Sequence, residues 1–355
     1  MSAVAGRPRI LIVRLSAIGD VIHALPVLDA LRRALPEAHL GWAVHPGPAN
    51  LLEGHPQLDE VVLVPRRDWT PGGLLRIRRL LREHGPWDAA VDVQGLTKSG
   101  LVALLSGARQ RIGFAGPASR EINALFMNCR VRPRARAVID MNLELLRPLG
   151  IEPGPARAVL HENAEDIAHV CEWAAEARIG PGSTLLLDAF AGWETKVWPR
   201  ERWLVVAREA ARRHGLRPLV AYGPGEHDSA AALAAEISAP GCQPVLPPPT
   251  TLRQYTAMVR RYVAAAVGGD TGPIHLAAAL GVPTVMMFGP SDAQRNAPVF
   301  ADARFETIQD LSQPCAGTFA RRCPHHAPGH CMDGVTAEAV VAALDRLLGA
   351  DRTHA

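Results

Sequence analysis

Lysine is almost absent from this chain of 355 residues, although arginine is abundant. The 38 basic residues include only two lysines, Lys98 and Lys196. A lysine kept where arginine is used nearly everywhere else suggests a need for a compact ammonium group rather than a planar guanidinium group. Lys98 and Lys196 are therefore candidates for binding an anionic ligand.

Long hydrophobic runs are also missing. No apolar run reaches the roughly 18 residues that a membrane span needs, and the N-terminal run at residues 10–13 is too short for a secretory signal. Hydrophobic residues make up 48% of the chain, which is long enough for two domains with separate cores. We expect a globular cytoplasmic protein without sequence repeats or low-complexity segments.

Cysteine is scarce, and its six copies do not form a typical disulfide pattern. Cys129, Cys171 and Cys242 lie in apolar segments, which predicts reduced thiols in the core. Three further cysteines alternate with histidines near the C-terminus, and these residues are Cys315, Cys323, Cys331, His325, His326 and His330. Seven residues separate successive cysteines of this group, whereas structural zinc sites use two to four. We expect a packed turn there rather than a metal site.

The formal charge of +3 hides an uneven distribution. Residues 1–158 hold 21 basic and 14 acidic residues, a net charge of +7, and the remainder holds 17 and 21, a net charge of −4. The basic half predicts an anionic partner, the alternative being an uneven solvated surface. Within it, the arginines of residues 74–82 form a basic amphipathic segment that could rest on anionic headgroups or be an ordinary surface helix.

Buried-strand patterns alternate with helical patterns along the whole chain. Strands are expected at residues 9–14, 40–44, 61–64, 89–93, 109–114, 184–189, 217–221, 263–267 and 282–288. Helices are expected from residue 21 to 35 with a kink or restart at Pro26, and at 72–83, 97–105, 140–149, 164–178, 200–214, 228–237, 252–261, 274–280 and 336–348. This alternation predicts parallel βαβ units in doubly wound sheets.

A Pro/Gly-rich break at residues 150–155 divides this pattern into two parts. We expect an N-terminal domain at residues 1–155, a second domain at 156–335 and a C-terminal helix in residues 336–355. Open α/β sheets bind ligands at the carboxyl ends of their strands, which predicts a binding cleft between two such edges.

Residues 268–275, with the sequence Gly-Gly-Asp-Thr-Gly-Pro-Ile-His, lie between an expected strand and an expected helix. The N-terminus of a helix offers unpaired N–H groups and a positive dipole to a phosphate, and glycine allows a ligand to approach the backbone closely. Asp270 and Thr271 fall where a helix cap belongs, and capping alone is the alternative to a binding role. His275 lies in the first turn, where a charged imidazole is disfavoured, so it suits an anionic ligand better.

Residues 16–20, Ser-Ala-Ile-Gly-Asp, follow the first expected strand. They contain only one of the glycines of the Gly-x-Gly-x-x-Gly fingerprint, which argues against an NAD(P)-dependent dehydrogenase. Asp20 lies beside a helix N-terminus, where its ionised form is favoured and can accept a proton from a hydroxyl group. A helix cap would explain this residue as well.

These motifs together resemble glycosyltransferase family 9, the bacterial lipopolysaccharide heptosyltransferases. Residues 270–275 are similar to its Asp-Thr-Gly-x-x-His signature, and residues 281–290 continue as in that family. Further similar segments are residues 16–20, 92–99, 111–114, 120–121, 196–199 and 222–226, in the family's order. Phe-Ala-Gly at 190–192 departs from the Thr or Ser residues that family members often place there for the donor phosphates.

The resemblance implies a GT-B fold, two Rossmann-like doubly wound domains facing a cleft, whose last helix crosses back to the first domain. It implies inverting transfer of heptose from ADP-heptose to the inner core of lipopolysaccharide, at Kdo-lipid A or a heptose. Asp20 would be the base, and Lys98, Arg111 and Arg120 would bind the anionic acceptor. The donor would be bound by Lys196, Glu226, Asp270, Thr271, Gly272 and His275.

The resemblance also implies a nucleotide-sugar co-substrate without a metal or other cofactor. We expect a monomer that binds no nucleic acid and rests peripherally on the cytoplasmic face of the inner membrane. The alternatives are a family 9 transferase with another nucleotide sugar or acceptor, a nucleotide-dependent sugar oxidoreductase or epimerase, and a catalytically silent carbohydrate-binding relative. The presence of Asp20 and Lys196 argues against the silent relative.

Overall fold

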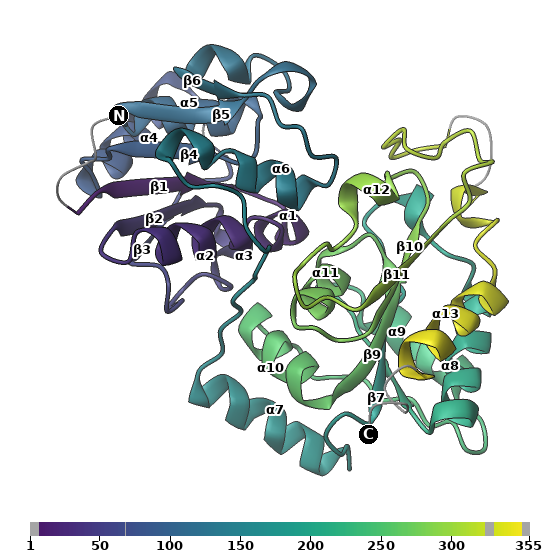
Figure 1. Cartoon of the computed structure of the whole chain (residues 1–355). Helices are drawn as coiled ribbons and strands as arrows, with labels where there is room; N and C mark the ends of the chain where they lie inside the picture. The colour runs from purple at the N-terminus through teal and green to yellow at the C-terminus, as the bar shows by residue number, and fades with distance from the viewer. Residues whose placement is uncertain (1–6, 68, 324–329, 350–355) are drawn as a thin grey trace. The chain divides into compact units, whose positions relative to one another are not determined.

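The chain divides into two compact units (Figure 1). The computed structural model describes residues 7–67, 69–323 and 330–349. The first unit is Met1–His161 with Val299–Ala301, and the second is Glu162–Pro298 with Asp302–Ala355. The boundary therefore lies a few residues after the predicted linker. No helix in the described part of the chain has the length and apolar character needed to cross a membrane.

A parallel sheet forms the centre of the first unit, with the described strands in the order β3-β2-β1-β4-β5-β6. Its strands are β1 (Arg9–Val13), β2 (His39–Val44), β3 (Glu60–Leu63), β4 (Ala89–Asp92), β5 (Gln110–Phe114) and β6 (Cys129–Val131). The first five agree with the predicted ranges within a residue or two. The sequence analysis missed β6, because it has three residues and none of them is fully buried. The strand order reverses between β1 and β4, and such a reversal marks the usual ligand site of an open α/β sheet.

The helices of the first unit connect these strands. They are α1 (Ile18–Ile22), α2 (Leu25–Ala34), α3 (Pro46–Ala49), α4 (Pro71–Glu83), α5 (Thr97–Leu105) and α6 (Val138–Glu144), with 3-10 turns η1 (Gly116–Ala118), η2 (Asn123–Phe126) and η3 (Arg147–Leu149). Pro26 lies in the first turn of α2, so the predicted helix restarts there. Ile77 and Leu81 of α4 pack with Leu11 of β1 and Val102 of α5 in one buried cluster.

The second unit has a parallel sheet with the order β11-β10-β9-β7-β8 among its described strands. They are β7 (Thr184–Asp188), β8 (Arg217–Val220), β9 (Val263–Gly269), β10 (Thr284–Phe288) and β11 (Phe305–Gln309). The order reverses between β7 and β9, so the carboxyl ends of these two neighbours form the expected ligand edge. The sequence analysis missed β11, an edge strand without fully buried residues.

Helices cover both faces of this second sheet (Figure 1). They are α7 (Ala164–Glu176), α8 (Arg200–His214), α9 (His227–Ile237), α10 (Leu252–Tyr262), α11 (Gly272–Ala279), α12 (Ala293–Asn296) and α13 (Ala337–Gly349), with turns η4 (Glu194–Lys196) and η5 (His330–Met332). On one face α8, α9 and α13 share a core with the strands, and α7, α10 and α11 lie on the other. Burial on both faces explains why β7 reads as a continuous apolar run.

The C-terminal helix α13 packs within the second unit. Val340 and Leu344 are buried in the same cluster as Val206 of α8 and Val285 of β10. Its apolar face lies between α8 and the strands of the second sheet. The expected contact of this helix with the first domain remains a prediction.

A close approach between β9 and α11 depends on Gly268. A Cβ atom at this position would collide with the Ile274 side chain and lie 3.0 Å from Cβ of Asp188. Glycine therefore allows α11 to pack directly against the end of the strand from which it emerges.

We expect Gly268→Ala to destabilise the second unit by about 1–3 kcal/mol, the usual effect of overpacking a tightly packed core. The effect would be measured as the free energy of unfolding in urea. Gly192→Ala is the control, because a Cβ there meets no atom within 4 Å. Equal stability of the two variants would contradict the close approach.

Candidate active site

The carboxyl end of β9 carries a buried ion cluster centred on Asp270. Nζ of Lys196 lies 2.8 Å from Oδ2 of Asp270 and 2.8 Å from its backbone oxygen. Nε2 of His275 lies 2.8 Å from Oδ1 of the same carboxylate. The side chain of Lys196 is 12% exposed, that of Asp270 is 8% exposed and that of His275 is 3% exposed. The structure thus brings together three of the predicted donor-binding residues.

Two further residues, Asn296 and Trp193, contact this cluster. Nδ2 of Asn296, in α12, donates to Oδ2 of Asp270 at 3.1 Å. The ring of Trp193 lies 4.5 Å from Nζ of Lys196, a cation–π contact. Burial raises the pKa of Asp270, but the hydrogen bond and charge of His275 and the Lys196 ammonium outweigh it and hold the pKa well below its usual range. Asp270 is therefore an anion that fixes a lysine and a histidine at the start of α11.

Thr271 and Gly272 form the start of α11, as the motif predicts. Thr271 is the N-cap residue, Gly272 is the first helical residue, and the N–H of His275 bonds to the Thr271 carbonyl at 3.1 Å. The eight-residue helix begins at the switch point of the sheet, where first-turn N–H groups and the helix dipole favour a phosphate.

Asp188, at the end of β7, was missed by the sequence analysis. Its side chain is buried and accepts a short hydrogen bond from the Thr271 hydroxyl. Burial raises the pKa of Asp188 to about 7; the Thr271 hydrogen bond lowers it and the charge of Glu226 raises it further. The sequence pattern that could have indicated Asp188 is a carboxylate directly after the three leucines at 185–187.

Glu226 lies at the N-terminus of α9, beyond the end of β8. Its Oε2 accepts the N–H of Gly223 at 2.7 Å, which closes the turn between the strand and the helix. Because β8 pairs in parallel with β7, Glu226 follows its strand at the same edge of the sheet as Asp188, and its charge raises the pKa of Asp188. Its ribose-binding role remains a prediction.

Asp20 of the first unit lies in the first turn of α1, beyond the end of β1. Oδ1 of Asp20 lies 2.5 Å from a guanidinium nitrogen of the buried Arg14, and Oδ2 accepts the N–H of Ala17 at 3.1 Å. The carboxylate therefore caps the helix, yet its side chain is 45% exposed. Burial raises the pKa of Asp20, but Arg14, His23 and the Ala17 N–H together lower it below the usual value, so the side chain is ionised at neutral pH.

The loop after β4 adjoins the loop of Asp20. Oε1 of Gln94 accepts the N–H of Leu15 at 2.8 Å, and Arg14 donates to the Val93 carbonyl at 2.7 Å. The buried Asp92 shapes this loop by accepting hydrogen bonds from the N–H groups of Gln94 and Gly95. Two predicted motifs therefore meet at the switch point of the first sheet.

The predicted acceptor residues occupy three different settings. Lys98, in the first turn of α5, is exposed and lies 5.1 Å from the ring of Trp69. Arg111 is partly buried and donates to the carbonyls of Phe126 and Ala108, so it also ties β5 to its surroundings. Arg120 is exposed. Their contacts with an acceptor remain predictions.

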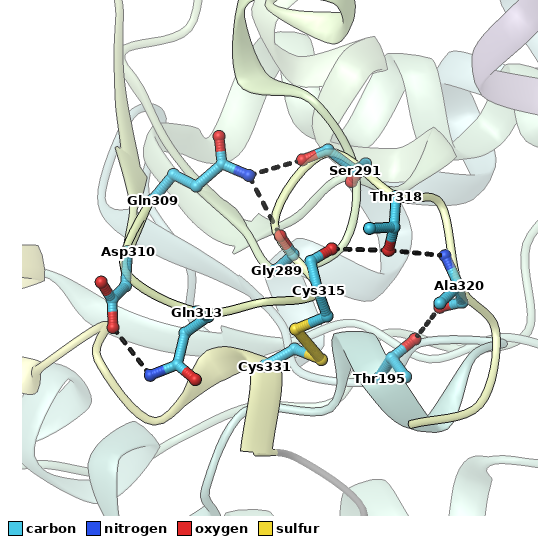
Figure 2. The surroundings of a disulfide bond; sticks show 10 residues. All are labelled: Thr195, Gly289, Ser291, Gln309, Asp310, Gln313, Cys315, Thr318, Ala320 and Cys331. Atoms are coloured by element: carbon cyan, nitrogen blue, oxygen red, sulfur yellow. Dashed lines mark hydrogen bonds between the residues drawn. A yellow bond between two sulfur atoms is a disulfide. The ribbon is translucent and has the colours of Figure 1, made fainter. Parts of the chain in front are cut away.

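A disulfide joins Cys315 and Cys331 in the segment before α13 (Figure 2). The sequence predicted a packed turn here but no pairing of its cysteines; the fold brings the Cα atoms of this pair to 6.2 Å across 16 residues of sequence. The segment that the disulfide closes also supports the lysine site, since the hydroxyl of Thr195 donates to the Ala320 carbonyl at 2.8 Å.

The other four cysteines lie outside this disulfide. Cys129, Cys171, Cys242 and Cys323 are free thiols, and Cys171 is exposed rather than in the core. Within the described ranges, no group of three or more His, Cys, Asp or Glu side chains could hold a metal ion. His325 and His326 lie outside the described residues.

Two parallel α/β units, each with polar motifs at the switch point of its sheet, define a two-domain fold of the GT-B type. Residues 74–326 match the model of "Glycosyltransferase family 9 (heptosyltransferase)". The chain belongs to glycosyltransferase family 9, and it is a glycosyltransferase.

Known relatives and structures agree with this membership. The chain is 30% identical to lipopolysaccharide heptosyltransferase 1 of Pseudomonas aeruginosa over 89% of this chain and 88% of that protein. It is 27% identical to the enzyme of the same name from Escherichia coli K12, over 80% of this chain and 88% of that protein. The fold matches a family 9 glycosyl transferase from Veillonella parvula with a TM-score of 0.81, at 21% identity over 98% of this chain and 99% of that one. E. coli heptosyltransferase WaaC with ADP matches with a TM-score of 0.72, at 23% identity over 96% and 99%.

We expect Asp188→Asn to stabilise the protein increasingly as the pH rises. The pKa of an unfolded aspartate is about 3.9, whereas that of folded Asp188 is about 7. The wild-type protein therefore loses stability as the pH rises from about 4 to about 7, because the folded state holds the proton more tightly.

The advantage of Asp188→Asn over wild type should grow by roughly 2–3 kcal/mol between pH 5 and pH 8, measured by urea unfolding. Asp59→Asn is the control with the opposite sign, because burial raises the pKa of Asp59 less than the Leu40 N–H and Arg32 lower it. A stability advantage of Asp188→Asn that does not depend on pH would refute the raised pKa of Asp188 in the folded protein.

Proposed function

We propose that this glycosyltransferase transfers a heptose from an ADP-activated donor to the inner core of lipopolysaccharide, with inversion at the anomeric carbon. Membership of the heptosyltransferase family supports this proposal, as do relatives named lipopolysaccharide heptosyltransferase 1. One solved structure of E. coli WaaC contains ADP and another contains ADP-2-deoxy-2-fluoro heptose. The observation that carries the proposal is the cluster of Lys196, Asp270 and His275 at the start of α11.

The donor diphosphate binds at the second unit in this proposal. The N–H groups of the first turn of α11 bind the phosphates, and Lys196 stabilises the negative charge that grows as ADP leaves. Asp270 holds Lys196 in position before the donor arrives, so little reorganisation is needed during the reaction. Glu226 binds the ribose hydroxyls. This chemistry requires no metal cofactor, because Lys196 and the helix supply the positive charge.

The acceptor hydroxyl is activated at the first unit. Asp20 is ionised and partly exposed, so its carboxylate can accept the hydroxyl proton as the acceptor oxygen attacks the anomeric carbon. Arg14 holds the carboxylate in one orientation. Lys98, Arg111 and Arg120 bind the phosphates and carboxylates of the acceptor in a unit with excess positive charge.

The direct test uses purified full-length protein with ADP-heptose and Kdo-lipid A. The release of ADP is measured by chromatography. We expect turnover with ADP-heptose, and a rise in melting temperature with ADP but not with UDP-sugars. Stabilisation and turnover with a different nucleotide sugar would favour another family 9 activity.

We expect Asp20→Asn to lower kcat by about 10²–10⁴-fold, the usual contribution of general acid–base catalysis, with donor affinity nearly unchanged. Asparagine keeps the shape and can still accept the Ala17 N–H, but it cannot take a proton. Asp166→Asn is the matched control, because Asp166 accepts the Asn163 N–H at 3.1 Å from the same position in its own helix. A folded Asp20→Asn enzyme with unchanged kcat, under conditions where chemistry limits the rate, would refute the mechanism.

A basic and apolar face of the first unit suits the membrane that carries such an acceptor. The neighbouring elements α4, α5 and η2, with the residue before η2, expose Leu75, Leu104, Ile122 and Leu125. The arginines at positions 76, 78, 79 and 82 of α4 are exposed as well. Exposed leucines beside arginines are typical of segments that lie on anionic headgroups. We include peripheral contact with the inner membrane in the proposed function.

The double variant Leu75→Asp with Leu125→Asp should abolish or strongly weaken binding to vesicles that contain anionic phospholipid, measured by cosedimentation at low salt. Two inserted charges oppose burial of the face in the interface. Leu311→Asp, at a leucine of the second unit that is 76% exposed, should leave vesicle binding unchanged. Absence of vesicle binding by the wild-type protein would exclude this part of the proposal.

A further inference from the structure

The threonine that begins α11 behaves differently from threonines that begin other helices of this chain. The hydroxyls of Thr70, Thr251 and Thr336 each accept an N–H from the first turn of their own helix, at 3.2 Å. Such capping is the ordinary role of threonine at this position. The hydroxyl of Thr271 instead donates to Asp188, and no side chain of the described residues caps α11.

The orientation of Thr271 matters because α11 has few N–H groups to offer a ligand. Pro273 has no N–H, and the N–H of His275 is used within the helix. An N-cap hydroxyl bonds to the second or third residue of the helix, so a hydroxyl turned toward α11 would take the N–H of Ile274. That N–H is one of the groups that a phosphate needs at this helix end.

Asp188 is placed to keep the hydroxyl turned away. It ends β7, pairs in register with Gly268 of β9 and is 6% exposed. The buried hydroxyl of Tyr255, on α10, has no hydrogen-bond partner among the described residues. Burial raises its pKa, and the charge of Asp188 raises it further. The titratable groups that interact electrostatically with Asp188 are Glu226 before α9 and Tyr255 on α10. The cluster of Lys196, Asp270 and His275 is connected to Asp188 through Thr271, the residue after Asp270.

We propose that Asp188 is a positioning residue for the donor: by accepting the Thr271 hydroxyl, it keeps the N-terminus of α11 open for the diphosphate. This inference rests on the proposed function, because it assumes that ADP binds at α11. Asp188 acts through Thr271 and does not itself touch the donor. No sequence motif indicated Asp188, so this role adds a residue to the predicted donor site.

The test is a double-mutant cycle on the affinity for ADP, measured by titration calorimetry with full-length protein. Asp188→Ala should weaken ADP binding about fivefold. The released Thr271 hydroxyl would form one capping hydrogen bond with α11, and ADP would have to break this bond in order to bind. In the Thr271→Val background, Asp188→Ala should have almost no effect, because no hydroxyl remains to compete. Thr184→Val is the control for lost stability, since the Thr184 hydroxyl bonds to the Tyr262 carbonyl at the opposite end of β7.

Rescue by a conservative variant gives a second readout, because asparagine keeps the hydrogen-bond acceptor that the positioning role requires. Asparagine can accept the Thr271 hydroxyl but cannot ionise. Asp188→Asn should therefore bind ADP as tightly as wild type at pH 6. Asp188→Ala, which lacks the acceptor, should bind ADP about fivefold more weakly than Asp188→Asn under the same conditions.

The outcomes separate this inference from the proposed function. Equal loss of affinity on Asp188→Ala in both backgrounds, or no loss in the wild-type background, would overturn the positioning role and leave donor binding intact. An Asp188→Asn variant that loses as much ADP affinity as Asp188→Ala would also overturn it. Failure of the folded wild-type protein to bind ADP would overturn the inference and the proposed function together.

Discussion

The burial of Asp270 is the constraint on which the candidate donor site depends. A carboxylate that is 8% exposed must be neutralised and hydrogen-bonded, because an unpaired buried charge costs several kcal/mol. Lys196, His275 and Asn296 meet this need from η4, α11 and α12. One buried anion thus holds three elements at the carboxyl edge of the second sheet, and two of its partners are cationic or able to become so.

Asp188 and Asp270 lie after neighbouring strands, yet their environments shift their pKa values in opposite directions. Burial raises both, but the cations beside Asp270 reverse the effect, whereas Asp188 has only a hydroxyl donor and a nearby carboxylate. Opposite shifts in adjacent acids are typical of functional sites. The edge of the sheet therefore combines a permanent anion that orients Lys196 with an acid that titrates near neutral pH.

The segment closed by the Cys315–Cys331 disulfide gives this site its outer support. It receives the Thr195 hydroxyl at the Ala320 carbonyl, directly beside Lys196 in the chain. Gly289 adds to the packing, because a Cβ there would lie 2.9 Å from the Thr195 carbonyl. Residues more than 90 positions further along the sequence thus help Asp270 to fix the position of Lys196.

Local sequence patterns were enough to predict the two parallel sheets and the bounds of α5 and α8. These features follow from hydrophobic periodicity and Gly/Pro signals, which act over short ranges. The grouping of Lys196, Asp270 and His275 was instead implied by the resemblance to the family, and the structure brings the three side chains together. The roles of Asp20, Glu226, Lys98, Arg111 and Arg120 remain predictions of the same kind.

Only the tertiary structure decided the partners that lie far apart in the chain. Asp188 meets Thr271 across 83 residues, Cys315 meets Cys331 through a folded turn, and α13 fills a groove of its own unit. Edge strands β6 and β11 exist because a neighbouring strand offers hydrogen bonds, although their own patterns are weak. A hydrogen bond or a packed face depends on which surfaces meet, and a local pattern specifies the surface of an element without specifying its partner.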